Sequence, residues 1–312
     1  MVYPVPRMRI FTVCLREQQI IFVVIQRNLK CYLKIKGCEI AVRKLYIDPE
    51  VSRLFNDQNL FEQITKFDGK VFRSLENRRT TRIEKDGQKF FIKCHFGVGW
   101  REIFKNLLQW RWPVVGAENE FRALARLKCL GISSPTPVLF VSEGLNPAYK
   151  RSCIITKALE GTKSLEELFE SRDIDAPLKR SLARKLGLIA RTLHENGVNH
   201  RDFYLCHFHY ELNVKEPSLY LIDLHRAQLR HRTPARWRIK DVGGLFFSTF
   251  NYNLTFRDVL RFMHVYSGKT LRQTLTEDAE FWRRAYKRAS RLYLQDYESL
   301  PSWIIRIGIK SL

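Results

Sequence analysis

The pattern of apolar and polar residues predicts a strand-rich first half of the chain. Residues 70–95 contain a strand, a polar turn and then a hairpin, which Asp86-Gly87 would close with a tight two-residue turn. Two later apolar runs, 137–142 and 152–158, are also typical of strands. We therefore expect β-structure to dominate up to about residue 158.

Helical spacing begins near residue 100 and dominates the second half. Helices are predicted over about 100–108, over 117–130 before Gly131, and over 178–196 before Gly197, since glycine often follows a helix C-terminus. The pattern from about residue 240 onward is helical as well. Strands followed by helices predict an α+β protein with two lobes.

The predicted helix at 100–108 collects large apolar side chains on one face: Trp100, Ile103, Phe104, Leu107 and Leu108. Core packing is the simpler interpretation of this stripe, and we prefer it. The alternative is an interfacial helix near lipid headgroups, with contributions from Arg101, Lys105, Trp110, Arg111 and Trp112.

The predicted domains are an N-terminal extension at 1–41, an N-lobe at 42–158 with an inserted amphipathic helix near 100–112, and a helical C-lobe at 159–312. The extension differs in composition from the rest of the chain, since it contains three of the seven cysteines and two short apolar runs. It is either translated from upstream of the natural start, which we prefer, or a lineage-specific piece.

Charge is the outlier of the composition. Lys and Arg number 54 against 32 Asp and Glu, a formal net charge of +22, so the surface should attract polyanions. The seven cysteines form no C-x-x-C pair, and free thiols in a reducing compartment fit best. Since no apolar run approaches the ~20 residues that span a bilayer, we expect a cytosolic protein, attached at most to a membrane face.

Four charged residues occur in the order that phosphoryl transfer requires. Lys93 lies in a predicted strand, and Glu120 lies in the following long helix, with Glu118 as its competitor. Asp202 follows the third helix in an H-R-D motif, and Asp223 ends a short apolar strand 21 residues later. A cation for the nucleotide phosphates and two carboxylates, one near the attacking hydroxyl and one for Mg²⁺, are the parts of a kinase.

The segments "NHRDFYLCHF", "LIDLHRAQ" and "RWRIKDVGGLFFS" resemble the lipopolysaccharide core heptose I kinases, the RfaP/WaaP family of protein-kinase-like enzymes. The resemblance extends from about Arg43 to the C-terminal helices. It implies a two-lobed protein-kinase-like fold, with a β-rich N-lobe and a helical C-lobe. It also implies ATP- and Mg²⁺-dependent phosphorylation of the first heptose of the inner core, at the cytoplasmic face of the inner membrane.

The resemblance implies a role for each matching residue. Asp202 would be the catalytic base, and Asp223 would hold Mg²⁺. Lys93 would hold the nucleotide phosphates, with Glu120 positioning it. Asp241 would brace the catalytic loop through its backbone amides, and we expect His200 to be a packed histidine that supports the same loop.

Two departures from protein kinases affect the predicted site. No G-x-G-x-x-G precedes Lys93, so Arg78 and Arg79 of the turn "SLENRRTT" would contact phosphates by charge. His207 stands where kinases have a metal-binding Asn; it could ligate metal, although Mg²⁺ prefers oxygen. A zinc site at Cys206, His207 and His209 is disfavoured, because neighbouring residues of an extended segment point to opposite faces.

A basic run lies between Asp223 and Asp241, with few residues to spare for a regulated activation loop. A solvated face is one interpretation of it, and binding of an anionic glycolipid acceptor is the other. The acceptor residues would be Arg226, Arg230, Arg232, Arg236, Arg238 and Lys240. The remaining charge could serve anionic lipid or an acidic protein such as an acyl carrier protein.

Three rival functions remain at this stage. The enzyme rival is a kinase for another inner-core sugar, such as octulosonic acid. A nucleic-acid-binding protein would also be basic, but no helix-turn-helix, zinc-finger, RRM or KH signature occurs, so we expect no nucleic-acid partner. A pseudokinase scaffold is disfavoured because Lys93, Asp202 and Asp223 are all present.

Overall fold

The computed structural model describes residues 9–16, 19–26, 29–36, 39–54, 59–75, 77–108, 113–171, 174–252 and 254–306. The chain divides into two compact units. Unit 1 comprises residues 1–122 and 135–158, and unit 2 comprises residues 123–134 and 159–312.

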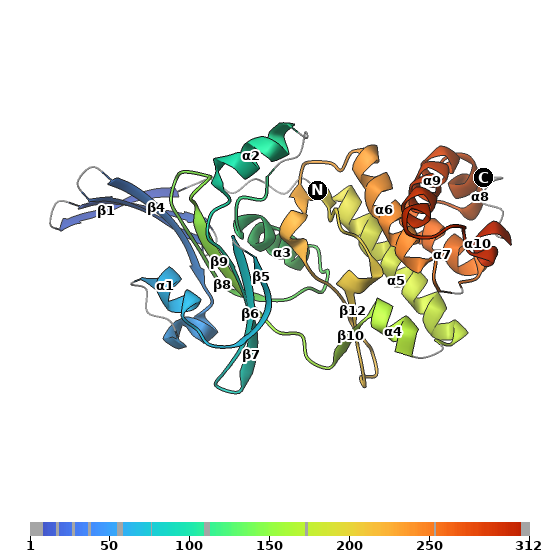
Figure 1. Ribbon diagram of the computed structural model, residues 1–312, viewed down its shortest axis with the longest axis horizontal. Helices are drawn as coiled ribbons and strands as arrows, with labels where there is room; N and C mark the ends of the chain where they lie inside the picture. Colours follow the sequence, from blue (N-terminus) through green and yellow to red (C-terminus); the bar gives the residue numbers. More distant parts are fainter. Residues whose placement is uncertain are drawn as a thin grey trace. The chain divides into compact units, whose positions relative to one another are not determined.

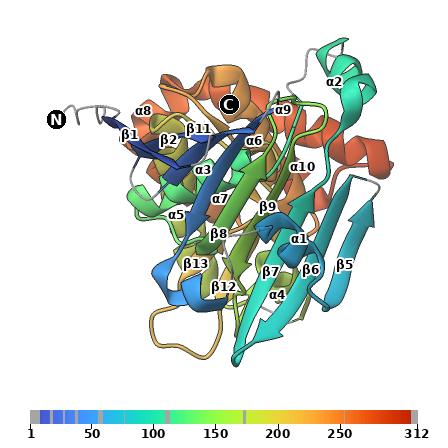
Figure 2. The same cartoon turned by 90° about the vertical axis from the view of Figure 1, so that its left-hand side faces the viewer.

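Unit 1 is built on an antiparallel sheet of nine strands in the order β1-β2-β3-β4-β8-β9-β7-β6-β5 (Figure 2). The strands are β1 (Arg9–Arg16), β2 (Gln19–Gln26), β3 (Leu29–Lys36), β4 (Glu39–Ile47), β5 (Lys70–Leu75), β6 (Arg78–Lys85), β7 (Gln88–His95), β8 (Pro137–Glu143) and β9 (Arg151–Lys157). The predicted hairpin between β6 and β7 turns at Asp86 and Gly87, which have φ of 51° and 71°. Positive φ at both turn residues is the reason why Asp-Gly favours this tight turn.

The helical segments of unit 1 cover the two faces of this sheet. They are the 3-10 helix η1 (Pro49–Leu54) and the helices α1 (Leu60–Thr65), α2 (Gly99–Leu108) and the start of α3 (Glu118–Cys129). Helices α1 and α3 lie on opposite faces (Figures 1 and 2). The core on the α1 side contains Leu60, Phe61 and Ile64, packed against alternate residues of the strands such as Ile83 and Ile92.

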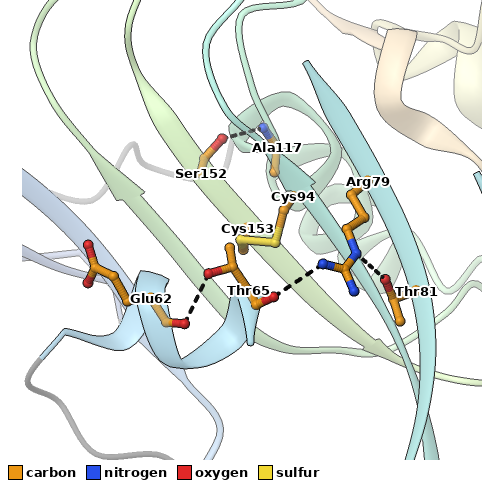
Figure 3. Close-up of a disulfide and its surroundings, with 8 residues drawn as sticks. All are labelled: Glu62, Thr65, Arg79, Thr81, Cys94, Ala117, Ser152 and Cys153. Atoms are coloured by element: carbon orange, nitrogen blue, oxygen red, sulfur yellow. Dashed lines mark hydrogen bonds between the residues drawn. A yellow bond between two sulfur atoms is a disulfide. The ribbon is translucent and has the colours of Figure 1, made fainter. Parts of the chain in front are cut away.

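One pair of cysteines contradicts the prediction of free thiols. Cys94 of β7 and Cys153 of β9 face each other across the strand pair, with Cα atoms 4.2 Å apart, and form a disulfide on the α1 side of the sheet (Figure 3). The two residues are 59 positions apart, and only the register of β7 against β9 brings them together. Cys129 and Cys206 are free.

Unit 2 is mainly helical, with small strands that support its loops. Its helices are α4 (Leu165–Ser171), α5 (Ala176–Glu195), α6 (Ala235–Thr249), α7 (Phe256–Ser267), α8 (Leu271–Thr276), α9 (Ala279–Asp296) and α10 (Ser302–Arg306) (Figure 1). Its strands are β10 (Thr162–Ser164), β11 (Val198–Asn199), β12 (Phe208–Glu211), β13 (Leu219–Leu221) and β14 (Gln228–Leu229). The 3-10 turns η2 (Leu205–His207) and η3 (Leu224–Arg226) complete it.

The core of unit 2 forms where α5 packs against α7, and α6 against α9. Leu182, Leu186 and Leu193 supply the buried stripe of α5, and Trp282 of α9 is almost completely enclosed. Asp175 caps α5, since its side chain accepts a hydrogen bond from the backbone N–H of Leu178 at 2.8 Å. The observed architecture confirms the α+β prediction, with an antiparallel sheet followed by a helical region.

Helix α2 lies where the pattern predicted it, but its apolar stripe is not core. Only Ile103 is buried, whereas Trp100, Phe104, Leu107 and Leu108 are 43%, 57%, 45% and 83% exposed. The preferred interpretation of core packing was therefore wrong. A helix whose apolar stripe is buried in the core and a helix whose stripe lies at an interface show the same periodicity. The pattern alone could therefore not distinguish the two. Residues 110–112, also part of the prediction, lie outside the described residues.

Candidate active site

In unit 1, Lys93 of β7 and Glu120 of α3 form an ion pair of 2.7 Å between Nζ and Oε1. Lys93 points away from the α1 core, because its strand neighbours Ile92 and Cys94 occupy the buried side. The Glu120 side chain is only 5% exposed, and its Oε2 has no hydrogen-bond partner among the described residues. A buried carboxylate of this kind holds an ammonium group in a fixed position.

The competing residue, Glu118, has other partners. Its carboxylate meets Lys44 at 2.7 Å and Lys150 at 2.9 Å. Burial would raise the pKa of Glu118, but the hydrogen bonds and charges of these two lysines outweigh it, so that the pKa is lowered. Glu118 is therefore a structural anion that ties α3 to β4 and to the segment before β9.

Arg78 and Arg79 project from opposite faces of β6. Arg78 is directly opposite His95 and shares a face with Thr80, the cross-strand neighbour of Lys93. Arg79 points to the α1 side, where it donates hydrogen bonds to the backbone carbonyl of Thr65 at 3.3 Å and to a threonine hydroxyl on its own strand at 3.2 Å (Figure 3). The structure thus separates two residues that were predicted to act together, and only Arg78 lies on the face of Lys93.

In unit 2, the catalytic-loop motif follows directly after α5. Gly197 ends the helix with φ of 76°, and an added Cβ there would clash with the backbone of Arg230. Asp241 of α6, 1% exposed, accepts hydrogen bonds from the backbone N–H groups of His200 at 2.7 Å and Arg201 at 2.9 Å. Arg201 has φ of 76°, a left-handed conformation that is costly for a residue with a side chain. Asp241 therefore holds a strained turn in place.

His200 is fully buried beneath the loop. Its Nε2 lies 2.9 Å from the backbone carbonyl of Ile222, and since a carbonyl only accepts, Nε2 must carry the proton. Burial lowers the pKa of His200, although the charge of Asp241 opposes the shift, so the ring is neutral near pH 7. The side chain joins the H-R-D turn to the residue that precedes Asp223.

Asp202 presents a carboxylate that is 16% exposed and ion-paired to Arg226, with 2.8 Å between Oδ1 and Nη1. Lys240 of α6 belongs to the same charged group. Its pKa is lowered, first by burial and then by the charges of Arg201, Arg226 and Arg288, while Asp202 opposes the shift. A carboxylate held in this way can act as a general base only for a hydroxyl brought within hydrogen-bond distance of it.

Asp223 is contacted by two histidines. His225 Nδ1 donates to Asp223 Oδ1 at 2.7 Å, and His207 Nε2 lies 3.8 Å from Oδ2. His207 Nδ1 lies 2.6 Å from the backbone carbonyl of Asp202, so this nitrogen carries the proton. In a neutral ring Nε2 then has only a lone pair to offer, and that lone pair lies near a carboxylate oxygen. With the ring neutral, the two acceptor atoms lie side by side and could both serve as ligands of a cation.

This donor set fits a divalent metal that also has phosphate oxygens and water as ligands. Asp223 supplies the oxygen that Mg²⁺ prefers, and His207 supplies an additional nitrogen. Within the described parts of the chain, no group of three or more His, Cys, Asp or Glu side chains could hold a metal by itself. The described residues therefore contain no closed zinc site of the kind weighed for Cys206, His207 and His209.

The predicted basic run divides into several groups. Arg230, Arg236 and Lys240 lie over the Trp237 ring at 5.3–5.5 Å, and Arg230 also hydrogen-bonds the side chains of Asn199 and Gln228. Arg238 lies over Phe281 instead, and Arg232 is exposed. Arg226 and Lys240 are the two members that act electrostatically on Asp202.

Comparison with known proteins defines the family. A model of the lipopolysaccharide kinase (Kdo/WaaP) family matches residues 62–266. The chain belongs to this family. The lipopolysaccharide core heptose(I) kinase WaaP of Pseudomonas aeruginosa is 41% identical over 257 residues, which are 80% of this chain and 96% of the relative. The enzyme of the same name from Escherichia coli K12 is 41% identical over 249 residues, which are 78% and 94% of the two chains.

A solved structure described as WaaP in complex with acyl carrier protein has the same fold. Its TM-score is 0.70 at 36% identity, and the match covers 80% of this chain and 99% of that one. The predicted membership of a lipopolysaccharide kinase family and the predicted kinase-like α+β fold are both confirmed.

Sequence reasoning missed two histidines that support the site. His194 of α5 lies between Asp241, 3.3 Å from Oδ2, and the hydroxyl of Tyr266, 2.9 Å away, and it is 3% exposed. His225 contacts the carboxylate of Asp223. A histidine next to the buried stripe of α5, and another two residues after a strand-end Asp, are the signals that could have identified them.

Proposed function

We propose that this protein transfers the γ-phosphoryl group of ATP to a hydroxyl of the first heptose in the lipopolysaccharide inner core. The observation that carries the proposal is the loop of unit 2, where Asp241 holds a strained H-R-D turn and Asp202 and Asp223 present carboxylates for base and metal. The relatives that are 41% identical bear the name of heptose(I) kinase, which supports heptose as the acceptor.

In the proposed reaction, Asp202 Oδ accepts the proton of the sugar hydroxyl as its oxygen attacks the γ-phosphorus. The proton transfer makes the hydroxyl a better nucleophile as the bond to phosphorus forms. Arg226 lies 2.8 Å from the same carboxylate and fixes its direction. Lys240 adds positive charge to the region in which the negative acceptor and phosphates would bind.

We assign Asp223 as the principal ligand of Mg²⁺ and His207 as a second ligand through Nε2. A divalent ion held by these two residues would supply positive charge against the negative charge that develops on the transferred phosphoryl group. The chain prepares both ligands beforehand, because His225 fixes Asp223 and the carbonyl of Asp202 fixes the His207 ring. In unit 1, Lys93 would bind nucleotide phosphates, held by Glu120, with Arg78 on the same face of the sheet.

The basic composition also supports partners. A net charge of +22 favours the anionic acceptor and the anionic cytoplasmic face of the inner membrane, where we place the protein as a peripheral enzyme. No helix in the described part of the chain is long and apolar enough to cross a bilayer. Because one solved relative is described in complex with acyl carrier protein, we also propose that an acidic carrier protein binds this chain.

The test is phosphate transfer from radiolabelled ATP to purified lipopolysaccharide that carries the heptoses but lacks core phosphate. Wild-type protein should label it, and Asp202→Asn should lower kcat at least about a hundredfold, since general-base catalysis contributes that much or more. Asp175→Asn is the matched control, because Asp175 is an exposed N-cap of α5 and is not part of the proposed site. Full activity of Asp202→Asn would contradict the mechanism. Labelling of an acceptor that has octulosonic acid but no heptose would favour the rival sugar kinase.

A further inference from the structure

Helix α2 and the turn between β8 and β9 form an exposed surface of unit 1. The first residue of the helix donates a hydrogen bond from Gly99 N to the backbone carbonyl of Ala148 at 2.9 Å, which ties the helix to that turn. Gly97 reinforces the contact, because a Cβ there would lie 2.8 Å from the same carbonyl oxygen. The helix and the turn are therefore neighbours through the backbone.

The exposed side of α2 is apolar over two helical turns. Trp100, Phe104, Leu107 and Leu108 recur at helical spacing and are 43–83% exposed, and the rings of Trp100 and Phe104 stack at 5.7 Å. The neighbouring segments add Phe96, Leu145 and Tyr149, which are 39%, 61% and 68% exposed. We call these seven residues the α2 surface. Seven large apolar side chains exposed on neighbouring segments are unusual on a soluble protein and indicate a binding surface.

Positive charge borders this surface. Arg101 and Lys105 lie on α2 away from the apolar side chains, with Glu102 as the one acidic residue of the helix. Lys105 and Glu102 are 3.6 Å apart and both about half exposed, so their interaction is weak. Basic residues beside exposed Trp, Phe and Leu are typical of a helix that lies in the interface of an anionic bilayer.

We propose that the α2 surface binds an anionic phospholipid bilayer, with Trp100, Phe104, Leu107 and Leu108 entering the boundary between headgroups and acyl chains. The inference rests on the proposed function, because an enzyme that acts on the headgroup sugars of a glycolipid meets its acceptor at such a boundary. A bilayer fits better than a protein partner here. The side chains project from a helix, and lipid adapts to projecting side chains, whereas a protein would need a matching groove.

The test is co-sedimentation of the full chain with vesicles of phosphatidylethanolamine and phosphatidylglycerol, and with vesicles of phosphatidylcholine alone. Wild-type protein should bind the anionic vesicles at least about tenfold more tightly, since each basic residue near the surface adds to the attraction. The double variant Phe104→Ser/Leu108→Ser should lose at least about tenfold in that affinity, because two large apolar side chains no longer leave water. Leu188→Ser, a residue of α5 that is 57% exposed, is the matched control and should bind as wild type does.

A second readout separates this inference from the proposed function. With acceptor dispersed in detergent, the Phe104→Ser/Leu108→Ser variant should transfer phosphate at the wild-type rate, because neither residue belongs to the proposed site. Equal vesicle binding by this variant and by wild type would overturn the membrane role, whatever the kinase result. Unchanged vesicle binding with lost binding to an acidic carrier protein would show that the surface serves a protein instead. Absence of phosphate transfer by wild type would contradict the proposed function, while the vesicle result would still stand.

Discussion

Replacing Asp241 by alanine should destabilise unit 2 and slow phosphate transfer, because one buried carboxylate holds the turn that carries Asp202. Asp241 accepts hydrogen bonds from two backbone N–H groups, at 2.7 and 2.9 Å, and lies 3.3 Å from His194 Nε2. Alanine would leave both N–H groups buried without a partner, at about 1–3 kcal/mol each. It would also remove the support for the left-handed Arg201, a conformation that costs roughly 1–2 kcal/mol.

Since these contributions overlap, we expect the free energy of unfolding to fall by about 3–5 kcal/mol, as for other losses of a buried charged partner. Asp241→Asn keeps one carbonyl oxygen for one of the two N–H groups, so its loss should be smaller, about 1–3 kcal/mol. In conditions where the fold persists, kcat of the alanine variant should drop about a hundredfold or more through displacement of Asp202.

The assay is urea unfolding followed by circular dichroism, together with transfer kinetics at low denaturant. Asp278→Ala is the control, since its partner Lys269 lies at the surface and the loss of stability should be small beside that of Asp241→Ala. If the free energy of unfolding of Asp241→Ala lies within about 1 kcal/mol of the wild-type value and kcat is unchanged, Asp241 does not brace the turn.

Three other predictions follow from single contacts. Glu120→Gln should raise the KM for ATP about tenfold or more, because Lys93 loses the charge that holds it; a KM equal to that of wild type would contradict this positioning role. His207→Asn should lower the ratio of activity with Co²⁺ to activity with Mg²⁺, because an oxygen replaces a nitrogen that suits later metals, and an unchanged ratio in metal-substituted assays would exclude His207 as a ligand. Cys153→Ser should lower the free energy of unfolding by about 2–4 kcal/mol, because the variant lacks the disulfide with Cys94. In thermal melting, a reductant should lower the melting temperature of the wild-type protein but not that of the variant. Equal melting temperatures of the variant and the wild-type protein without reductant would argue against the disulfide.

The residues that were predictable from sequence are those whose role depends on local motifs. The H-R-D motif follows a helix with a glycine stop, Asp223 ends a short apolar strand, and Lys93 lies in a hairpin strand, so each could be placed by its own neighbourhood. The pairing of Lys93 with Glu120 followed from their order in a kinase-like chain. The structure contains that pair at 2.7 Å.

The residues that were not predictable depend on register and on exposure. The pairing of Cys94 with Cys153 follows from how β7 lines up with β9, which a spacing of 59 residues does not reveal. Successive side chains of β6 point to opposite faces of the sheet. Arg79 therefore lies on the α1 side, whereas its neighbour Arg78 lies on the opposite face. For Arg226, the charge suggested contact with an acceptor, whereas the loop geometry directs its guanidinium to Asp202.

The most direct test of the proposed function is the position of the new phosphate. Wild-type protein, ATP, Mg²⁺ and lipopolysaccharide without core phosphate would be incubated, and the product would be analysed by tandem mass spectrometry and by phosphorus–proton correlation in NMR. We predict one phosphate, attached to the first heptose, and none in the product of Asp202→Asn. A newly added phosphate on octulosonic acid or on lipid A would contradict the proposal, and so would the absence of transfer by the wild-type protein.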